Sequence, residues 1–349
     1  MNKLISILVT LLIIGLAVSV NAAPVTLKLA TSAPEASDWV QGMRASAAEI
    51  KERTDGRVII KYYAGGVQGS DPQVLKKMRI RSLHGGVFTP SAINSQYPEI
   101  NLYGLALTFE SEPEARYVRA RMDKKLLDGL NEAGFISFGF ASTGFAMVMS
   151  GEPVRGVSDL RGKKVWVPEG DQVSYDTLKA LSVSPQPLPI TDVMVGLQTK
   201  LIEVVPVSAP GALFLQWYTR VKYVTDIPLL YTFGFMVIDK AMFEKIDAAD
   251  QTIVKEVLSG MFAEFDQNSV KDNADAYEAL INTGIEKVIP EQSEIDELHE
   301  TMAVSNREIV RQGAFSEELY DEMLTFIEEY RNGQNAVEES AEEGAVAAQ

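Results

Sequence analysis

Residues 160–210 alternate between short extended runs and helix-like segments, and this alternation constrains the fold more than any other feature of the chain. The runs at 163–167, 185–188 and 202–207 are expected to be strands, and the segments at 174–181 and 192–201 have helical spacing. Thr191 is expected to cap the second of these helices. Strands separated by helices at this pitch predict a parallel sheet with right-handed crossovers.

The carboxyl ends of two of these strands form the predicted binding site, because ligands of open parallel sheets bind beyond the carboxyl ends of the strands. Trp166, Glu169 and Asp171 lie at one end, and Ala209 follows the other. Trp166 could pack in a core or form a plate on which a ligand stacks, and we expect the plate. Glu169 and Asp171 could be solvated acids, or could accept a hydroxyl, an amine or a cation from the ligand.

The N-terminal half of the chain repeats this rhythm, with expected strands at 26–30, 58–62 and 84–88 and helices at 39–54 and 73–81. Two such units predict two similar α/β lobes. Segments 134–141 and 145–150 lead from the first lobe to the second, and segments 225–228 and 233–238 lead back. Paired crossings of this kind predict a hinge.

Residues 249–283 contain no proline and predict one helix of ~50 Å that spans both lobes, the alternative being two helices broken near Gly260 or Asp272. A small strand at 285–289 and helices at 293–313 and 316–330 follow. We expect lobe one to comprise 24–141 and 228–260, and lobe two 142–227 and 261–331. Residues 332–349 are acidic with few apolar anchors, which predicts a disordered tail.

The first 22 residues have the composition of an export signal. Lys3 precedes the apolar run 4–20, and Val20-Asn21-Ala22 suits signal peptidase. We expect cleavage after Ala22 and a soluble periplasmic protein, the alternative being an uncleaved anchor.

Composition excludes several classes of function. The chain has no cysteine and two histidines, and its formal net charge is −16. A disulfide framework and thiolate sites are therefore excluded, and nucleic acid and anionic membranes are unsuitable partners. His84 is expected to be structural and His299 solvated. Because the common hydrolase motifs are absent as well, we expect a monomeric binding protein without cofactor or metal site, and not an enzyme.

Several segments carry a resemblance to a known family: GRVIIKYYAGGVQGSDPQVLKKM, SLHGGVF, PVRGVSDLRGKKVWVPEGD and DVMVGLQTKLIEVV. They resemble the extracytoplasmic solute-binding proteins of TRAP transporters, the DctP-like family. The resemblance implies the type II-like fold of periplasmic binding proteins, with two α/β lobes around a central cleft. It also implies capture of a small organic acid for a membrane permease driven by a sodium gradient. In the family, an arginine that pairs with the ligand carboxylate usually stands where this chain has Trp166. Members also often carry an asparagine after the segment that corresponds to GLQTK, and this chain lacks it and has PVSAPG around Val207 instead.

Further side chains are candidate ligand contacts because they lie near expected strand ends or crossings, although several could equally be core: Phe88, Trp217, Thr31, Ser32, Ser142, Thr143 and Phe233. With Trp166 in place of arginine, we expect an organic acid with an apolar or aromatic body. The alternatives are a zwitterionic or cationic ligand held by cation–π contacts, and a sensor that presents its ligand to a membrane receptor.

Overall fold

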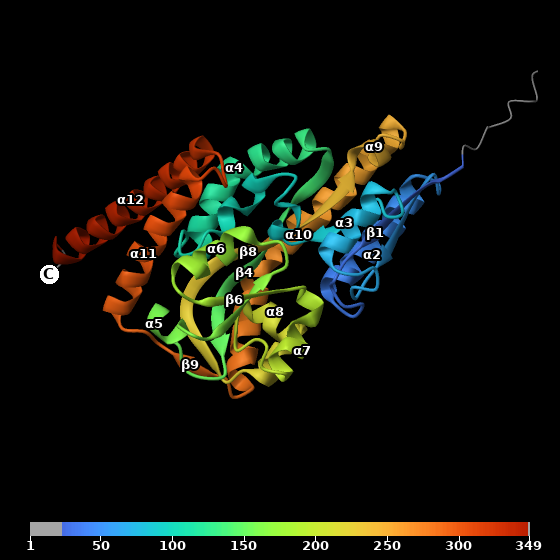
Figure 1. Cartoon of the computed structure of the whole chain (residues 1–349). Coiled ribbons are helices and arrows are strands. Elements are labelled where there is room, and N and C mark those ends of the chain that lie inside the picture. Colours follow the sequence, from blue (N-terminus) through green and yellow to red (C-terminus); the bar gives the residue numbers. More distant parts are fainter. Residues whose placement is uncertain (1–22, 348–349) are drawn as a thin grey trace, which may run out of the picture.

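The computed structural model describes residues 23–347, so the expected signal peptide lies outside the described residues. One nine-stranded sheet runs through the molecule in the order β2-β1-β3-β8-β4-β7-β5-β6, with β9 paired to β8. The two ends of this order form the two lobes, and β4 and β8 join them (Figure 1). Within residues 23–347, no helix is both long and apolar enough to span a bilayer.

Lobe one contains the parallel strands β1, β2 and β3 and the helices between them. The helix α2 begins where the Ser37 side chain accepts a hydrogen bond from Val40 N, and it buries Val40, Met43 and Ile50 against the sheet. The bounds are β1 Val25–Ala30, α2 Asp38–Arg53, β2 Val58–Tyr63, α3 Asp71–Arg79 and β3 Gly85–Phe88. The short 3-10 segment Pro90–Ile93 follows β3.

Lobe two repeats the pattern with the parallel strands β5, β6 and β7. Its elements are α5 Val157–Leu160, β5 Lys164–Pro168, α6 Gln172–Ala180, β6 Ser184–Leu188, α7 Val193–Gln198, β7 Val204–Val207 and α8 Ala209–Phe214. The expected cap at Thr191 is wrong. Thr191 lies inside the 3-10 segment Ile190–Asp192, and its hydroxyl donates to the Asp192 carboxylate rather than accepting from the helix.

Two long strands connect the lobes and replace the four short segments that the sequence predicted. β4 (Phe135–Ser150) and β8 (Tyr223–Asp239) pair antiparallel along most of their length. Their register shifts at three places, between Ser137 and Phe140, between Ser142 and Gly144, and between Ala146 and Val148. At one end β8 pairs with β3, and at the other β4 pairs with β7. The short β9 (Glu286–Val288) pairs with the start of β8.

The remaining helices cover the sheet. α10 (Ala248–Asn282) is continuous, as predicted, and runs past both lobes (Figure 1). The others are α4 Glu112–Glu132, α9 Lys240–Phe243, α11 Gln292–Arg311 and α12 Glu317–Ala347, with a 3-10 segment at Pro98–Gly104.

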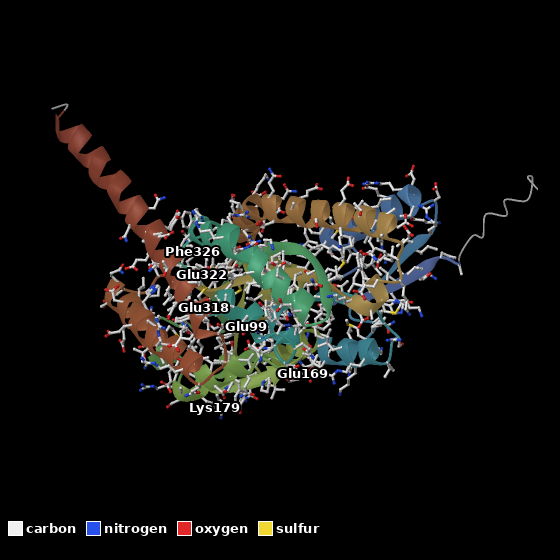
Figure 2. All side chains as sticks on the ribbon, turned by 90° about the horizontal axis from the view of Figure 1, so that it is seen from above. Glu99, Glu169, Lys179, Glu318, Glu322 and Phe326 are labelled. Carbon is white, nitrogen blue, oxygen red and sulfur yellow. The ribbon has the colours of Figure 1, made fainter. Side chains whose placement is uncertain are left out.

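The C-terminal helices differ from the expectation in two ways. Phe315, Tyr320 and Met323 pack in the same core as α4, in lobe one, whereas the sequence division placed 261–331 in lobe two. α12 also continues through the region expected to be a disordered tail, because its alanine and glutamate residues have high helix propensity. The distal part of α12 projects away from the body (Figure 2).

Candidate functional site

The carboxyl ends of the parallel strands from the two lobes face each other, and the lobes touch there. A Cβ atom added at Gly66, after β2, would lie 2.9 Å from Cγ2 of Thr191, after β6. One added at Gly170, after β5, would lie 3.8 Å from the Ser91 carbonyl oxygen. Val173 of α6 packs against the core of lobe one. The structure is therefore a closed form, with the candidate site enclosed between the strand ends.

Trp166 is held on two sides in lobe two. Its Nε1 donates to the Leu188 carbonyl at 3.0 Å, and its ring meets Trp217 edge-on with centroids 5.1 Å apart. Trp166 is 7% exposed and Trp217 is 1% exposed, and both belong to the core of lobe two. Because indole has a single donor and Leu188 already accepts it, Trp166 has only its ring to offer a ligand.

The two predicted acids lie close together in sequence and have different environments. Asp171 caps α6, since its Oδ1 accepts from Ser174 N at 3.0 Å, and burial raises the pKa of its carboxyl group. Glu169 is exposed at the surface of lobe two and is labelled in Figure 2. Asp171 therefore has a structural role at the head of α6, whereas the Glu169 carboxylate is free to act at the edge of the site.

The sequence analysis missed Asp71, the first residue of α3 in lobe one. Burial raises the pKa of Asp71 to about 6; hydrogen bonding from Thr89 opposes this rise, and the negative charge of Glu169 adds to it. Glu169 belongs to lobe two, so the two lobes bring carboxyl groups toward one another. An aspartate directly after the strand VIIKYY and its glycine turn was the available signal.

The segments that follow the six parallel strands contain no lysine or arginine. They are residues 31–37, 64–70, 89–97, 169–171, 189–192 and 208, and their charged members are Glu35, Glu169, Asp171 and Asp192. Any negative group of a ligand between these ends would depend on backbone N–H groups and hydroxyls for its hydrogen bonds.

The other predicted contacts are distributed between the strand ends, the two cores and the crossing. Phe88 and Phe233 are buried in the core of lobe one, and Ala209 and Trp217 in that of lobe two. The four remaining candidates carry hydroxyl groups and lie after β1 or on β4. Thr31 is buried and its hydroxyl accepts from Ala33 N; Ser32 is partly exposed; Ser142 and Thr143 lie on β4 at the crossing. None of these positions by itself shows a ligand contact, so their roles stay predictions.

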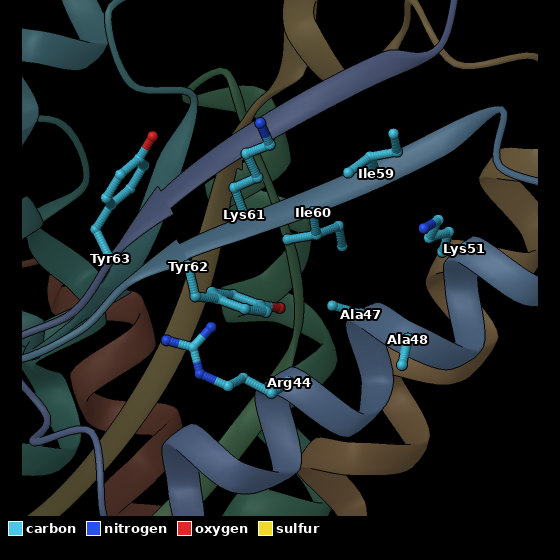
Figure 3. Close-up of a pocket in the computed structure, with 9 residues that line it drawn as sticks. All are labelled: Arg44, Ala47, Ala48, Lys51, Ile59, Ile60, Lys61, Tyr62 and Tyr63. Carbon is cyan, nitrogen blue, oxygen red and sulfur yellow. The ribbon is translucent and has the colours of Figure 1, made fainter.

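Two hollows lie beside lobe one. The first, of about 470 Å³, lies between α2 and β2, where Arg44 lies close to the buried Tyr62 ring (Figure 3). The second, of about 820 Å³, includes Ser142 and Thr143 of β4, Trp39 of α2 and Pro210 of α8. This second hollow therefore contains two predicted site residues and borders both lobes.

Comparison with known proteins decides the family. The sequence profile of bacterial extracellular solute-binding proteins, family 7 (DctP), matches residues 29–312. The chain belongs to this family. The predicted resemblance to DctP-like proteins is thus confirmed, and so is the two-lobed α/β fold.

Members of the family elsewhere are distant in sequence and close in fold. A solute-binding protein of Chromohalobacter salexigens is 21% identical over 265 residues, 75% of this chain and 76% of its own length. The sugar acid binding protein of Advenella mimigardefordensis, in complex with galactonate, has a TM-score of 0.80 at 20% identity, covering 88% of this chain and 99% of that one. A TRAP periplasmic solute-binding protein of Shewanella oneidensis with bound succinate has a TM-score of 0.80 at 15% identity, covering 87% and 100%.

Proposed function

We propose that this DctP-family protein is the solute-capturing component of a TRAP transporter. It acts in the periplasm as a monomer after cleavage behind Ala22, closes on a small organic acid, and delivers it unchanged to a membrane permease. The observation that carries the proposal is the family's two-lobed fold with strand ends in contact, at Gly66 with Thr191 and at Gly170 with Ser91. Relatives of the same fold bind galactonate and succinate, which supports an organic acid here.

The acid would lie between the strand ends with its body against the Trp166 ring. Since Trp166 replaces the usual arginine and no lysine or arginine follows the strands, hydroxyl and backbone donors would bind the carboxylate. Thr31 and Ser32 in lobe one and Ser142 and Thr143 at the crossing are the proposed donors. An apolar or aromatic body would then gain most from Trp166.

A thermal-shift screen of the mature protein tests this proposal. The panel would contain galactonate, succinate, benzoate and glycine betaine, each at a series of concentrations. A ligand that binds only the folded protein at one hundred times its Kd stabilises it by about 2.7 kcal/mol, which gives a clear rise in Tm. We expect at least one acid to raise the Tm, and recovery of that acid unchanged after prolonged incubation. No shift with any acid would contradict the proposal.

A second candidate is a zwitterionic or cationic ligand. The observation that favours it is the charge of the strand ends, where acids are present and lysine and arginine are absent. Glu169 could provide the counter-charge, and the Trp166 ring would attract a quaternary ammonium group. A Tm rise with glycine betaine and none with the three simple acids would establish this candidate over the first.

A further inference from the structure

We propose that Asp266, in the middle of α10, is the anchor of the hinge: it fixes β4 to lobe one at Ser142, so that lobe motion is confined to the residues from Thr143 onward. This inference rests on the proposed function only in assuming that the lobes open and close. It concerns residues away from the strand ends and assigns them no ligand contact.

The Asp266 carboxylate connects three elements. Its Oδ1 accepts from the backbone N of Ser142 at 2.8 Å and from Nη1 of Arg119 at 2.7 Å, and its Oδ2 accepts from Nη1 of Arg116 at 3.0 Å. Ser142 belongs to β4, the two arginines belong to α4, and Asp266 belongs to α10. The side chain of Asp266 is only 21% exposed, so these charge-assisted bonds are partly shielded from water.

Arg119 holds the same stretch of β4 from the other side. Its side chain is 5% exposed, and Nη2 donates to the Phe140 carbonyl at 2.9 Å while Nη1 also donates to the Tyr231 hydroxyl at 2.9 Å. Burial by itself would lower the pKa of Arg119, but its neighbours Tyr231, Asp123 and Asp266 outweigh that effect and the pKa is raised. Arg119 therefore stays charged and keeps these bonds at every physiological pH.

Glu112 completes the attachment of β4 to α4. It accepts from the Ser142 hydroxyl at 3.2 Å and from the Tyr231 hydroxyl at 3.4 Å, and it lies 3.0 Å from Nε of Arg116. The backbone N and the hydroxyl of Ser142 are thus both bound to carboxylates of other elements. Up to this residue β4 is part of the rigid body formed with α4, whose apolar face packs in the core of lobe one.

The strand changes character directly after Ser142. Its register with β8 shifts between Ser142 and Gly144, and Gly144 has a φ of +81°, which favours glycine. The side-chain bonds of this segment stay within the crossing strands: Gly144 N donates to the Ser142 hydroxyl at 3.1 Å, Thr143 donates to Thr232 at 2.8 Å, and Thr232 donates to the Gly144 carbonyl at 2.6 Å. From Met147 onward β4 pairs with β7 of lobe two. Gly144, which has more backbone freedom than other residues, thus lies between the anchored segment of β4 and the lobe that moves.

The test compares Asp266→Ala with Asp250→Ala in the full-length mature protein without ligand. Asp250 is the matched control, because it is also an α10 carboxylate bound to an arginine. Its side chain is 4% exposed and accepts two bonds of 2.9 Å from Arg57, but it lies in the first turn of the helix, away from the crossing. Both substitutions should lower the Tm.

Two measurements separate an anchor from a merely structural residue. Amide hydrogen exchange of peptide 140–146 should be about tenfold faster in Asp266→Ala, the change that loss of one charge-assisted bond would give, and unchanged in Asp250→Ala. Because the chain has no cysteine, spin labels can be placed at Lys61→Cys in lobe one and Lys200→Cys in lobe two, which are both exposed. The distribution of distances between the labels should broaden in Asp266→Ala only.

Parent-like exchange and distances in Asp266→Ala, or equal changes in the two variants, would overturn the proposal. If Asp266→Ala does not fold, Asp266→Asn carries the test with a smaller change in the same direction, since it keeps the shape of the side chain and removes its charge. No ligand enters these measurements, so failure of the solute-binding proposal would appear in the thermal-shift panel and leave the hinge result standing.

Discussion

The two lobes are built from the same strand–helix rhythm and have different interiors. The core of lobe one contains a run of buried aromatic side chains on the crossing strands, Phe140, Tyr231, Phe233 and Phe235, and it is covered by α4 and the C-terminal helices. The core of lobe two is mainly aliphatic around the Trp166–Trp217 pair, in which Trp166 comes from β5 and Trp217 from the 3-10 segment Trp217–Arg220. The comparison leads us to expect that substitutions in the aromatic core of lobe one act on stability alone, whereas substitution of Trp166 in lobe two acts on ligand binding as well.

The largest expected effect is on the interior of lobe one. Phe235 is fully buried, with its ring 5.8 Å from that of Phe140 at 90°. We expect Phe235→Ala to lower the free energy of unfolding by about 3–5 kcal/mol, because it removes buried surface and leaves a cavity. Urea denaturation measures this loss. A loss below about 1 kcal/mol would break the comparison, since lobe one would then not depend on its aromatic residues.

Substitutions of Trp166 and Trp217 test the role of the core of lobe two. Trp166→Ala and Trp217→Ala each remove a buried indole and should each lower stability by about 3–5 kcal/mol. We expect Trp166→Ala also to weaken binding of the best acid in the screen by roughly tenfold to a thousandfold, as expected from the lost burial and aromatic contact. Trp217→Ala should leave affinity within a few-fold of the parent. Calorimetry at a temperature where all the variants are folded gives the affinities. If the two variants lose affinity to the same extent, then neither tryptophan has a role in binding beyond its packing in the core.

A smaller effect on stability is expected at Asp71 of lobe one, whose carboxyl group lies near that of Glu169 of lobe two. The pKa of Asp71 is raised from 3.8 to about 6, so the folded protein holds this proton more tightly than the unfolded chain does. Its contribution to stability is intact below pH 4 and is lost as the pH rises through 6. Asp71→Asn should therefore be more stable than the parent at pH 7.5, by about 1–3 kcal/mol, and equal to it near pH 4.

Thermal melts across this pH range measure the difference between parent and Asp71→Asn. Asp192→Asn is the control, because it alters an exposed acid at a strand end of lobe two and should change stability little at any pH. A constant difference between parent and Asp71→Asn from pH 4 to pH 7.5 would show that Asp71 does not titrate there.

The smallest effect is expected at the contact between the lobes. Gly66 has a φ of +69°, and an added Cβ would meet Cγ2 of Thr191. Gly66→Ala should weaken ligand binding by about three- to tenfold, since both backbone strain and the collision oppose closure. Adding Thr191→Ser removes that methyl group and should restore part of the affinity. If the double variant binds no better than Gly66→Ala, then strain alone accounts for the loss.

Much of this fold could be predicted because many of its strands and helices follow from local sequence patterns. The strands at 58–62 and 163–167 and the uninterrupted helix from residue 249 follow from periodicity and from the absence of proline. The attachment of α12 to lobe one could not be predicted, since it depends on packing against α4, about two hundred residues earlier in the chain. Local helix propensity also explains why α12 continues beyond residue 331, where the sequence was expected to be disordered, because alanine and glutamate favour the helix.

Some residues of the candidate site could likewise be predicted from local sequence, and others could not. Trp166 could be identified from its place on a strand, and Glu169 and Asp171 from their place after it. Asp71 is notable only because the folded chain partly buries it and brings it near Glu169. The bonds of Asp266 to Ser142 and Arg119 join residues more than one hundred positions apart. Ionic contacts between such distant residues have no periodic signature, so a single sequence does not reveal them.

The pairing of β8 with β3 has a consequence for the order of folding. Lobe one begins with β1 at residue 25, but its sheet needs residues 235–238 and its core needs side chains as far along as Ile327. A nascent chain therefore cannot complete its first lobe until nearly the whole sequence has been synthesised. Long-range pairing of this kind slows folding. The first lobe therefore acquires its complete set of native contacts only at the very end of synthesis, although its first strand is among the earliest parts of the chain to be made.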